Sequence, residues 1–133
     1  NIQLTIEPLG PKFSNNLQTI EQAVHFVQQI GLPGIGTMCD LRHMTASGDL
    51  FSSIETYKEW ILHAHIDLPW WDERLFPRRM DGYDYSRYIR HVLRTSCPRL
   101  SVEALHEADL SSGADSGVYL RELIKAGAAE VEV

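Results

Sequence analysis

Four short apolar runs alternate with amphipathic stretches along the chain, and this alternation constrains the fold more than any other feature. The apolar runs cover residues 2–9, 34–41, 60–68 and 100–105. Each is followed by a segment in which apolar residues recur at helical spacing. We predict these helices at about residues 17–30, 52–58, 84–94 and 116–126. Strand–helix alternation of this kind predicts parallel strands joined by helical crossovers.

The ends of the predicted helices carry recognisable signals. Ser14, Asn15 or Asn16 can cap the first helix, and Gly31 stands where a C-terminal glycine belongs. A loop through residues 47–49 is expected before the second helix, and the tail at 127–133 is interpreted as loosely held. The third helix has an apolar stripe that consists of Tyr85, Tyr88, Ile89 and Val92.

The predicted strands have one polar and one apolar face, which distinguishes a barrel from an open sheet. On the polar face lie Gln3, Thr5 and Glu7, then His63, His65 and Asp67, then Ser101 and Glu103. An open parallel sheet is covered by helices on both faces and has apolar strands. A closed barrel has eight strands and about 250 residues. The 133 residues therefore predict one domain, 1–133, that forms half of a barrel.

Each predicted strand also carries a charged or imidazole side chain near its C-terminal end: Glu7, Asp40, His65 and Glu103. The C-terminal strand ends of a barrel converge on the active site. Three carboxylates brought together repel one another, and a divalent cation relieves that repulsion. Mixed oxygen and imidazole ligands suit Mn²⁺, Mg²⁺, Co²⁺ or Zn²⁺. Taken singly, each residue is more simply a surface, cap or core residue; taken as four, they favour a metal site.

Four short segments, in this order, resemble the second half of the xylose-isomerase-like barrels, in particular the sugar phosphate isomerase/epimerase group. They are Ile6-Glu7-Pro8-Leu9, Asp40-Leu41-Arg42-His43-Met44, His63-Ala64-His65-Ile66-Asp67 and Ser101-Val102-Glu103-Ala104, with Asp81-Gly82-Tyr83-Asp84-Tyr85 as a further match. The resemblance covers about residues 3–124. It implies four parallel βα units that form the C-terminal half of a (β/α)8 TIM barrel.

The resemblance also implies roles for individual residues. Glu7, Asp40, His65 and Glu103 would be the metal ligands, and Glu7 and Glu103 would double as the acid/base pair. His43 would form a hydrogen bond with a substrate oxygen, and Arg74 would contact the substrate. Trp70 and Trp71 lie in the same long loop, and we expect Trp70 to line the substrate pocket, with plain packing as the alternative.

The function implied is a metal-dependent sugar or sugar phosphate isomerase or epimerase that moves a proton through an enediolate. A metal-dependent dehydratase or lyase on a hydroxy-keto acid could use the same site. Arg74, Arg78 and Arg79 would then suit the carboxylate, although a solvated loop also explains them. A non-catalytic fragment of such a barrel is the third hypothesis.

Composition limits the expected partners and compartment. The net charge of −6 argues against a nucleic-acid surface, and so against DNA repair of the AP-endonuclease type. No apolar run is long enough to span a membrane. Cys39 and Cys97 form no metal motif, and a reducing cytoplasm is the simplest expectation. The first four units of the family are missing, so we expect an N-terminal half, a complementing chain or self-pairing as a homo-oligomer.

Overall fold

The computed structural model describes residues 2–70, 74–97, 99–104 and 110–131, and these form four parallel strands in the order β1-β2-β3-β4. The strands are β1 (Leu4–Ile6), β2 (Ile35–Asp40), β3 (Ile61–Ile66) and β4 (Leu100–Val102). The helices are α1 (Ile20–Ile30), α2 (Leu41–Ser47), α3 (Ser52–Thr56), α4 (Tyr85–Leu93) and α5 (Leu110–Val131), with 3-10 turns η1 (Lys58–Trp60) and η2 (Arg79–Asp81). The predicted run of parallel βα units is confirmed.

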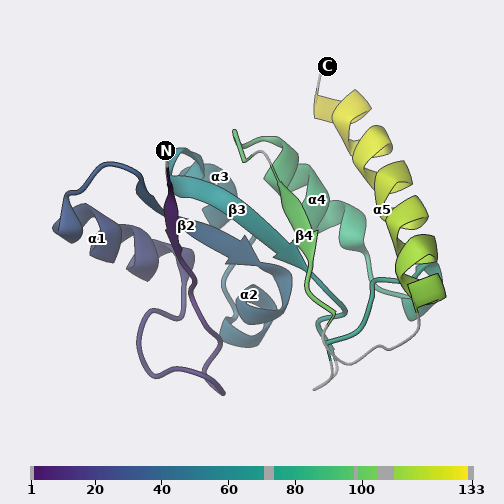
Figure 1. Cartoon of the computed structure of the whole chain (residues 1–133), viewed down its shortest axis with the longest axis horizontal. Coiled ribbons are helices and arrows are strands. Elements are labelled where there is room, and N and C mark those ends of the chain that lie inside the picture. The colour runs from purple at the N-terminus through teal and green to yellow at the C-terminus, as the bar shows by residue number, and fades with distance from the viewer. Residues whose placement is uncertain (1, 71–73, 98, 105–109, 132–133) are drawn as a thin grey trace.

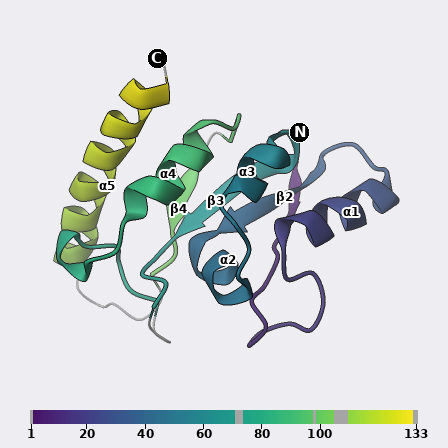
Figure 2. The same ribbon diagram turned by 180° about the vertical axis from the view of Figure 1, so that it is seen from behind.

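The crossover helices lie on one face of the sheet. Figure 1 shows the strands in front of α1, α3 and α4, and the reverse view in Figure 2 shows these helices in front of the strands. In the described part of the chain no helix covers the other face. The buried core lies under the helices, and the predicted stripe of Tyr85, Tyr88, Ile89 and Val92 belongs to it. The open face is the one that carries the polar side chains, as a half barrel requires.

Two predictions about the helices were wrong, and one was confirmed. The first helix is capped by Thr19, whose Oγ1 accepts from the Gln22 backbone N–H at 3.3 Å, whereas Ser14 instead accepts from the Asn16 N–H at 3.0 Å. The Gly31 C-cap is confirmed, with φ of 64°. A helix, α2, occupies residues 41–47, where no helix was predicted, because Asp40 caps it directly at the end of β2.

The C-terminal helix α5 is much longer than predicted. It begins at Leu110 and continues to Val131, so most of the tail taken as loosely held is helical. Gly127 does not end the helix. A Cβ atom at this position would lie 3.0 Å from Leu93 Cδ1, so glycine allows α5 to pack closely on α4. Within the described residues, no helix is long and apolar enough to cross a membrane.

The two outer strands of the sheet are short and poorly covered. Leu4 in β1 is 58% exposed and Val102 in β4 is 36% exposed, while five of the six residues of β2 are buried. Each outer strand presents an unpaired row of backbone N–H and C=O groups beside apolar side chains. Such edges pair readily with further strands. The architecture is therefore that of a sheet with two open sides.

The 133-residue chain on its own is expected to self-associate in solution, because both sheet edges are open and apolar. Multi-angle light scattering at increasing concentration measures this directly. The variant Leu4→Lys/Val102→Lys should shift the chain toward monomer, since lysine on an edge strand opposes pairing. A well-folded monomer of the unsubstituted chain at every concentration would contradict the half-barrel interpretation.

Candidate metal centre

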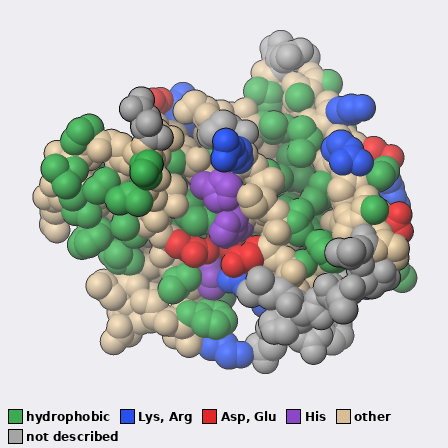
Figure 3. Space-filling view, viewed as in Figure 1, with side chains coloured by type: hydrophobic (Ala, Val, Ile, Leu, Met, Phe, Trp, Pro, Cys, Tyr) green, Lys and Arg blue, Asp and Glu red, His purple; other side chains and the backbone are tan. Residues whose placement is uncertain are grey.

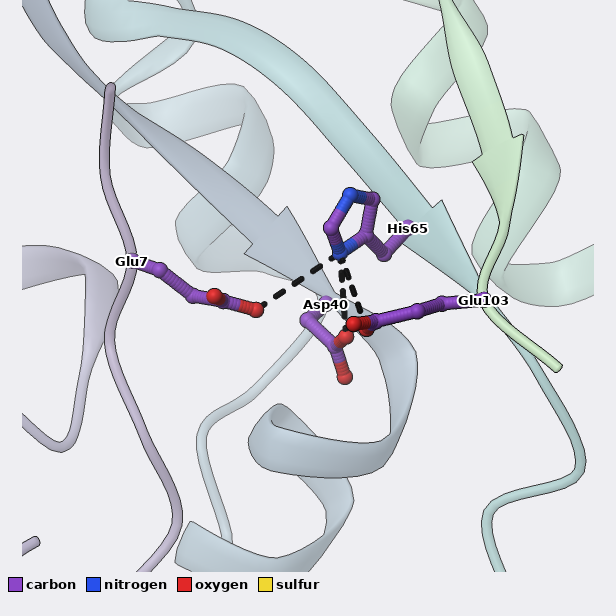
Figure 4. A group of neighbouring side chains, drawn as sticks. All are labelled: Glu7, Asp40, His65 and Glu103. Atoms are coloured by element: carbon purple, nitrogen blue, oxygen red, sulfur yellow. Dashed lines mark ion pairs between the residues drawn. The ribbon is translucent and has the colours of Figure 1, made fainter. Parts of the chain in front are cut away.

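The four predicted ligands come together at the C-terminal ends of the strands. One donor atom from each of Glu7, Asp40, His65 and Glu103 lies within 4.8 Å of the other three. Asp40 ends β2, His65 lies in β3, and the two glutamates follow β1 and β4. Figure 4 shows the four side chains pointing toward one another, with Glu7 and Glu103 reaching in from opposite sides. The structure thus brings the predicted residues together; their role as ligands stays a prediction.

These residues lie on the face of the sheet that the crossover helices leave open (Figure 1 and Figure 3). Figure 3 shows histidine and acidic side chains gathered at the centre of this face, between apolar regions. The hydroxyl of Tyr88, from α4 behind the sheet, lies 3.0 Å from the backbone oxygens of both Cys39 and His65 and can donate its single hydrogen to either. The backbone N–H of Glu103 donates to the Ile66 carbonyl at 3.2 Å. Strand pairing and helix packing together therefore fix the backbone positions from which the side chains of the cluster extend.

Asp40 serves the fold and the cluster with different oxygens. Its Oδ1 accepts from the His43 backbone N–H at 2.9 Å and so caps α2, while Oδ2 lies 3.5 Å from His65 Nδ1. The cap interpretation and the ligand interpretation of Asp40 are thus compatible. Burial opposes ionisation of this carboxyl, but the contacts with His65 and the His43 N–H outweigh it, and the pKa of Asp40 lies below its ordinary value.

His65 Nδ1 is the point on which the carboxylates converge. It lies 3.2 Å from Glu103 Oε2, 3.5 Å from Asp40 Oδ2 and 3.6 Å from Glu7 Oε1. Both this nitrogen and Glu7 Oε1 are buried and have no hydrogen-bond partner among the described residues. Asp40 and then Glu7 raise the pKa of His65 to about 10. Buried polar atoms normally have a bonding partner. A group that all four side chains can bind therefore fits the space between them.

A divalent cation meets that requirement. Three carboxylate oxygens and one imidazole nitrogen make a mixed hard and borderline donor set, which suits Mn²⁺, Mg²⁺, Co²⁺ or Zn²⁺. Such a cation would bind both buried atoms, which lack a hydrogen-bond partner in the described part of the chain, and would balance the carboxylate charge. The residues present therefore fit a metal ion. Neither cysteine takes part: Cys39 and Cys97 are free thiols.

Of the predicted substrate contacts, two lie beside the cluster. Arg74 Nη1 bonds to Glu103 Oε2 and lies 3.5 Å from Asp40 Oδ2. His43 Nε2 lies 3.9 Å from Glu7 Oε1, and burial lowers the pKa of this imidazole. Trp70 instead packs edge-on against Tyr83, with ring centroids 5.2 Å apart, and is 57% exposed. The neighbouring Trp71 lies outside the described residues, as does Pro98.

The arginines that crowd one loop in the sequence separate in the structure. Arg74 joins the carboxylates, whereas Arg79 pairs with Glu122 and stacks on Tyr119 at 4.8 Å. Arg78 donates to Ser112 at 3.4 Å, beside an open groove of about 540 Å³ along α5. Of these three arginines, Arg74 is the one whose printed contacts lie with the cluster.

A buried ion pair below the cluster was not foreseen. Arg42 Nε lies 2.7 Å from Asp67 Oδ2, and Arg42 Nη2 donates to the Leu68 carbonyl at 2.8 Å. Desolvation of Asp67 outweighs the attraction of Arg42 and raises the pKa of this carboxyl to about 6. The alternation of β3 placed Asp67 on the polar face. No sequence pattern identified Arg42, 25 residues earlier, as its partner.

No family model and no curated protein matches this sequence. Solved structures do match. An L-ribulose 3-epimerase covers 98% of this chain and half of its own (50%), with a TM-score of 0.80 and 17% identity. A xylose isomerase domain protein from Alicyclobacillus acidocaldarius subsp. acidocaldarius covers 94% of this chain and 51% of its own, with a TM-score of 0.74 and 23% identity. The IOLI protein, solved with a zinc atom, covers 97% of this chain and 48% of its own, with a TM-score of 0.62 and 17% identity.

These likenesses concern the fold. The chain spans about half the length of the solved proteins it matches, and it has the fold of half a TIM barrel, as predicted. An AP endonuclease of family 2 from Brucella melitensis shares this fold, at a TM-score of 0.65 and 18% identity. The fold therefore accommodates more than one chemistry, and function must be argued from the site.

Proposed function

We propose that the intact protein is a divalent-metal-dependent isomerase or epimerase of a sugar or sugar phosphate, and that this chain supplies its metal site. The observation that carries the proposal is the convergence of Glu7, Asp40, His65 and Glu103, in which buried His65 Nδ1 and Glu7 Oε1 have no hydrogen-bond partner among the residues that the structure describes. The solved epimerase and the zinc-containing IOLI protein, which share the fold, support it.

The two glutamates are proposed as the proton-transfer pair. A bound divalent cation would supply Lewis acidity, which stabilises negative charge on the oxygens of a hydroxy-ketone. One glutamate takes the proton from the carbon beside the carbonyl, which leaves an enediolate, and a proton is then returned to carbon. Glu7 and Glu103 reach in from opposite sides (Figure 4). Transfer across two faces of one carbon gives an epimer, and this arrangement favours it over isomerisation.

His43 and Arg74 are proposed to bind the substrate. Both present nitrogen donors beside the carboxylates, where the oxygens of a sugar would lie. Trp70 is proposed to cover the substrate from the loop after β3, with the packing against Tyr83 as its alternative role.

The alternative functions would give the same residues different roles. A dehydratase acting on a hydroxy-keto acid would use Arg74 for the substrate carboxylate, but Arg78 and Arg79 lie in the groove along α5 and do not support it there. Phosphodiester hydrolysis of the AP-endonuclease type is disfavoured by the net charge of −6. A metal-binding remnant without turnover would keep the cluster and fail every assay.

Removal of metal is expected to abolish proton exchange in the full-length protein. Chelator-treated protein, incubated with a panel of ketoses in D₂O, should leave the hydrogen beside the carbonyl unexchanged. Adding back Mn²⁺, Mg²⁺, Co²⁺ or Zn²⁺ separately should restore deuterium incorporation for at least one ketose, read by NMR or mass spectrometry. Tight metal binding without exchange in any ketose would favour the remnant. Loss of water from a hydroxy-keto acid, or cleavage of abasic DNA, would favour the corresponding alternative.

A further inference from the structure

The imidazole of His43 lies between two N–H donors that it cannot both satisfy. The Gly10 backbone nitrogen is 3.1 Å from Nδ1, and Arg74 Nη2 is 2.9 Å from Nε2. A neutral imidazole accepts at one nitrogen and donates at the other. An imidazolium carries a hydrogen on both nitrogens and accepts at neither, so the contact with the Gly10 N–H requires the neutral ring. One of the two contacts is therefore a hydrogen bond. In the other contact, an N–H of the ring faces an N–H of its neighbour, which is unfavourable.

The Gly10 amide has the stronger hold on the ring. Its hydrogen bond is buried, and a buried backbone N–H without an acceptor is costly. Its segment also lies tightly against α2, because a Cβ atom at Gly10 would come within 2.9 Å of Ala46 Cβ. The Asp40 cap fixes the first turn of α2, which carries His43. Neither the donor nor the ring can move away from the other without disturbing this packing.

The Arg74 guanidinium has other acceptors within reach. Its Nη1 bonds to Glu103 Oε2, and it lies 3.5 Å from Asp40 Oδ2 and 3.8 Å from Asp67 Oδ2. These are carboxylates of the cluster or next to it. A cation placed there neutralises part of the same charge that a divalent metal would neutralise. The carboxylates thus hold Arg74 in place, although its Nη2 group lies in an unfavourable contact with His43 Nε2.

We propose that the Gly10 amide fixes His43 with its hydrogen on Nε2, and that Arg74 is a stand-in cation which a divalent metal displaces from the carboxylates. The second half of this inference rests on the proposed metal site. Gly10 is then a positioning residue: it turns His43 into a fixed donor that faces the cluster and suits an oxygen acceptor on the substrate. Metal entry removes the guanidinium from Nε2–H and opens that donor.

The state of the ring can be read from ¹⁵N spectra of the metal-free, full-length protein labelled in histidine, with His43→Gln to assign the signals. We expect a protonated Nε2 and an unprotonated Nδ1 in the native protein and equally in Arg74→Ala. If Arg74 controlled the ring, the native protein would show the hydrogen on Nδ1, and Arg74→Ala would move it to Nε2. Either of those results would overturn the assignment to Gly10.

The displacement is tested by calorimetric titration with Zn²⁺. Arg74→Ala should bind Zn²⁺ more tightly than the native protein, by about tenfold, since one neighbouring charge shifts a site by about one logarithmic unit or more. Arg78→Ala is the matched control, because this arginine of the same loop bonds to Ser112. Its affinity should equal that of the native protein. Equal or weaker binding by Arg74→Ala would overturn the stand-in role.

The two measurements separate this inference from the proposed function. If neither protein bound Zn²⁺, the metal site and the displacement would both be wrong, while the ring spectra would still decide the role of Gly10. If metal bound as expected but no ketose were turned over, the function alone would fail. Binding only in Arg74→Ala would support the displacement most directly.

Discussion

Turnover is expected to fall by about 10²-fold or more in Glu7→Gln and in Glu103→Gln, which is the usual scale for loss of a general acid or base. Glutamine has nearly the size of glutamate and keeps one oxygen that can bind a metal, but it cannot take up a proton. Each glutamate lies within 3.6 Å of His65 Nδ1, and the two reach in from opposite sides (Figure 4). The loss should therefore appear in both single variants.

Metal content distinguishes loss of chemistry from loss of the site. Both Gln variants should bind metal more weakly than the native protein but still bind it, so turnover is compared at saturating metal. Glu59→Gln is the matched control, because Glu59 is exposed in η1, at the opposite end of β3. Its turnover should be unchanged. Full turnover of both site variants with metal bound would rule out the two-glutamate mechanism.

The cluster could be predicted from the sequence because the signal is periodic. In a strand, alternate residues share a face, so Glu7, His65 and Glu103 could be placed on the polar side from their spacing alone. Parallel strands then bring their C-terminal ends to one edge. The prediction needed only the strand positions, and the structure confirms those to within a few residues.

Features that depend on tertiary contacts could not be predicted in this way. The seven-residue helix α2 is too short for a helical period, and its start depends on Asp40, which also points into the cluster. A glycine such as Gly127 can either end a helix or allow two helices to pack closely. The sequence does not distinguish these roles; the contact with Leu93 in the structure does. The bond from Gly10 to His43 joins residues 33 apart through a backbone atom, which no residue pattern marks.

Breaking the buried pair of Arg42 and Asp67 is expected to cost more stability than any surface change. The side chains are only 8% and 1% exposed, and Asp67 Oδ1 has no hydrogen-bond partner within the described ranges. Arg42→Met would leave the Asp67 carboxylate buried without this guanidinium. Removal of one partner from such a pair typically lowers the free energy of unfolding by about 3–5 kcal/mol. Urea unfolding of the full-length, metal-free protein measures it.

The double variant Arg42→Met/Asp67→Leu tests where that cost comes from. If it comes from the unpaired charge, the double variant should recover most of the loss, because apolar residues of similar volume often replace a buried ion pair without penalty. The exposed pair of Arg79 and Glu122 supplies the control, and Arg79→Ala should cost no more than about 1 kcal/mol. If Arg42→Met cost as little as Arg79→Ala, the pair would be solvated.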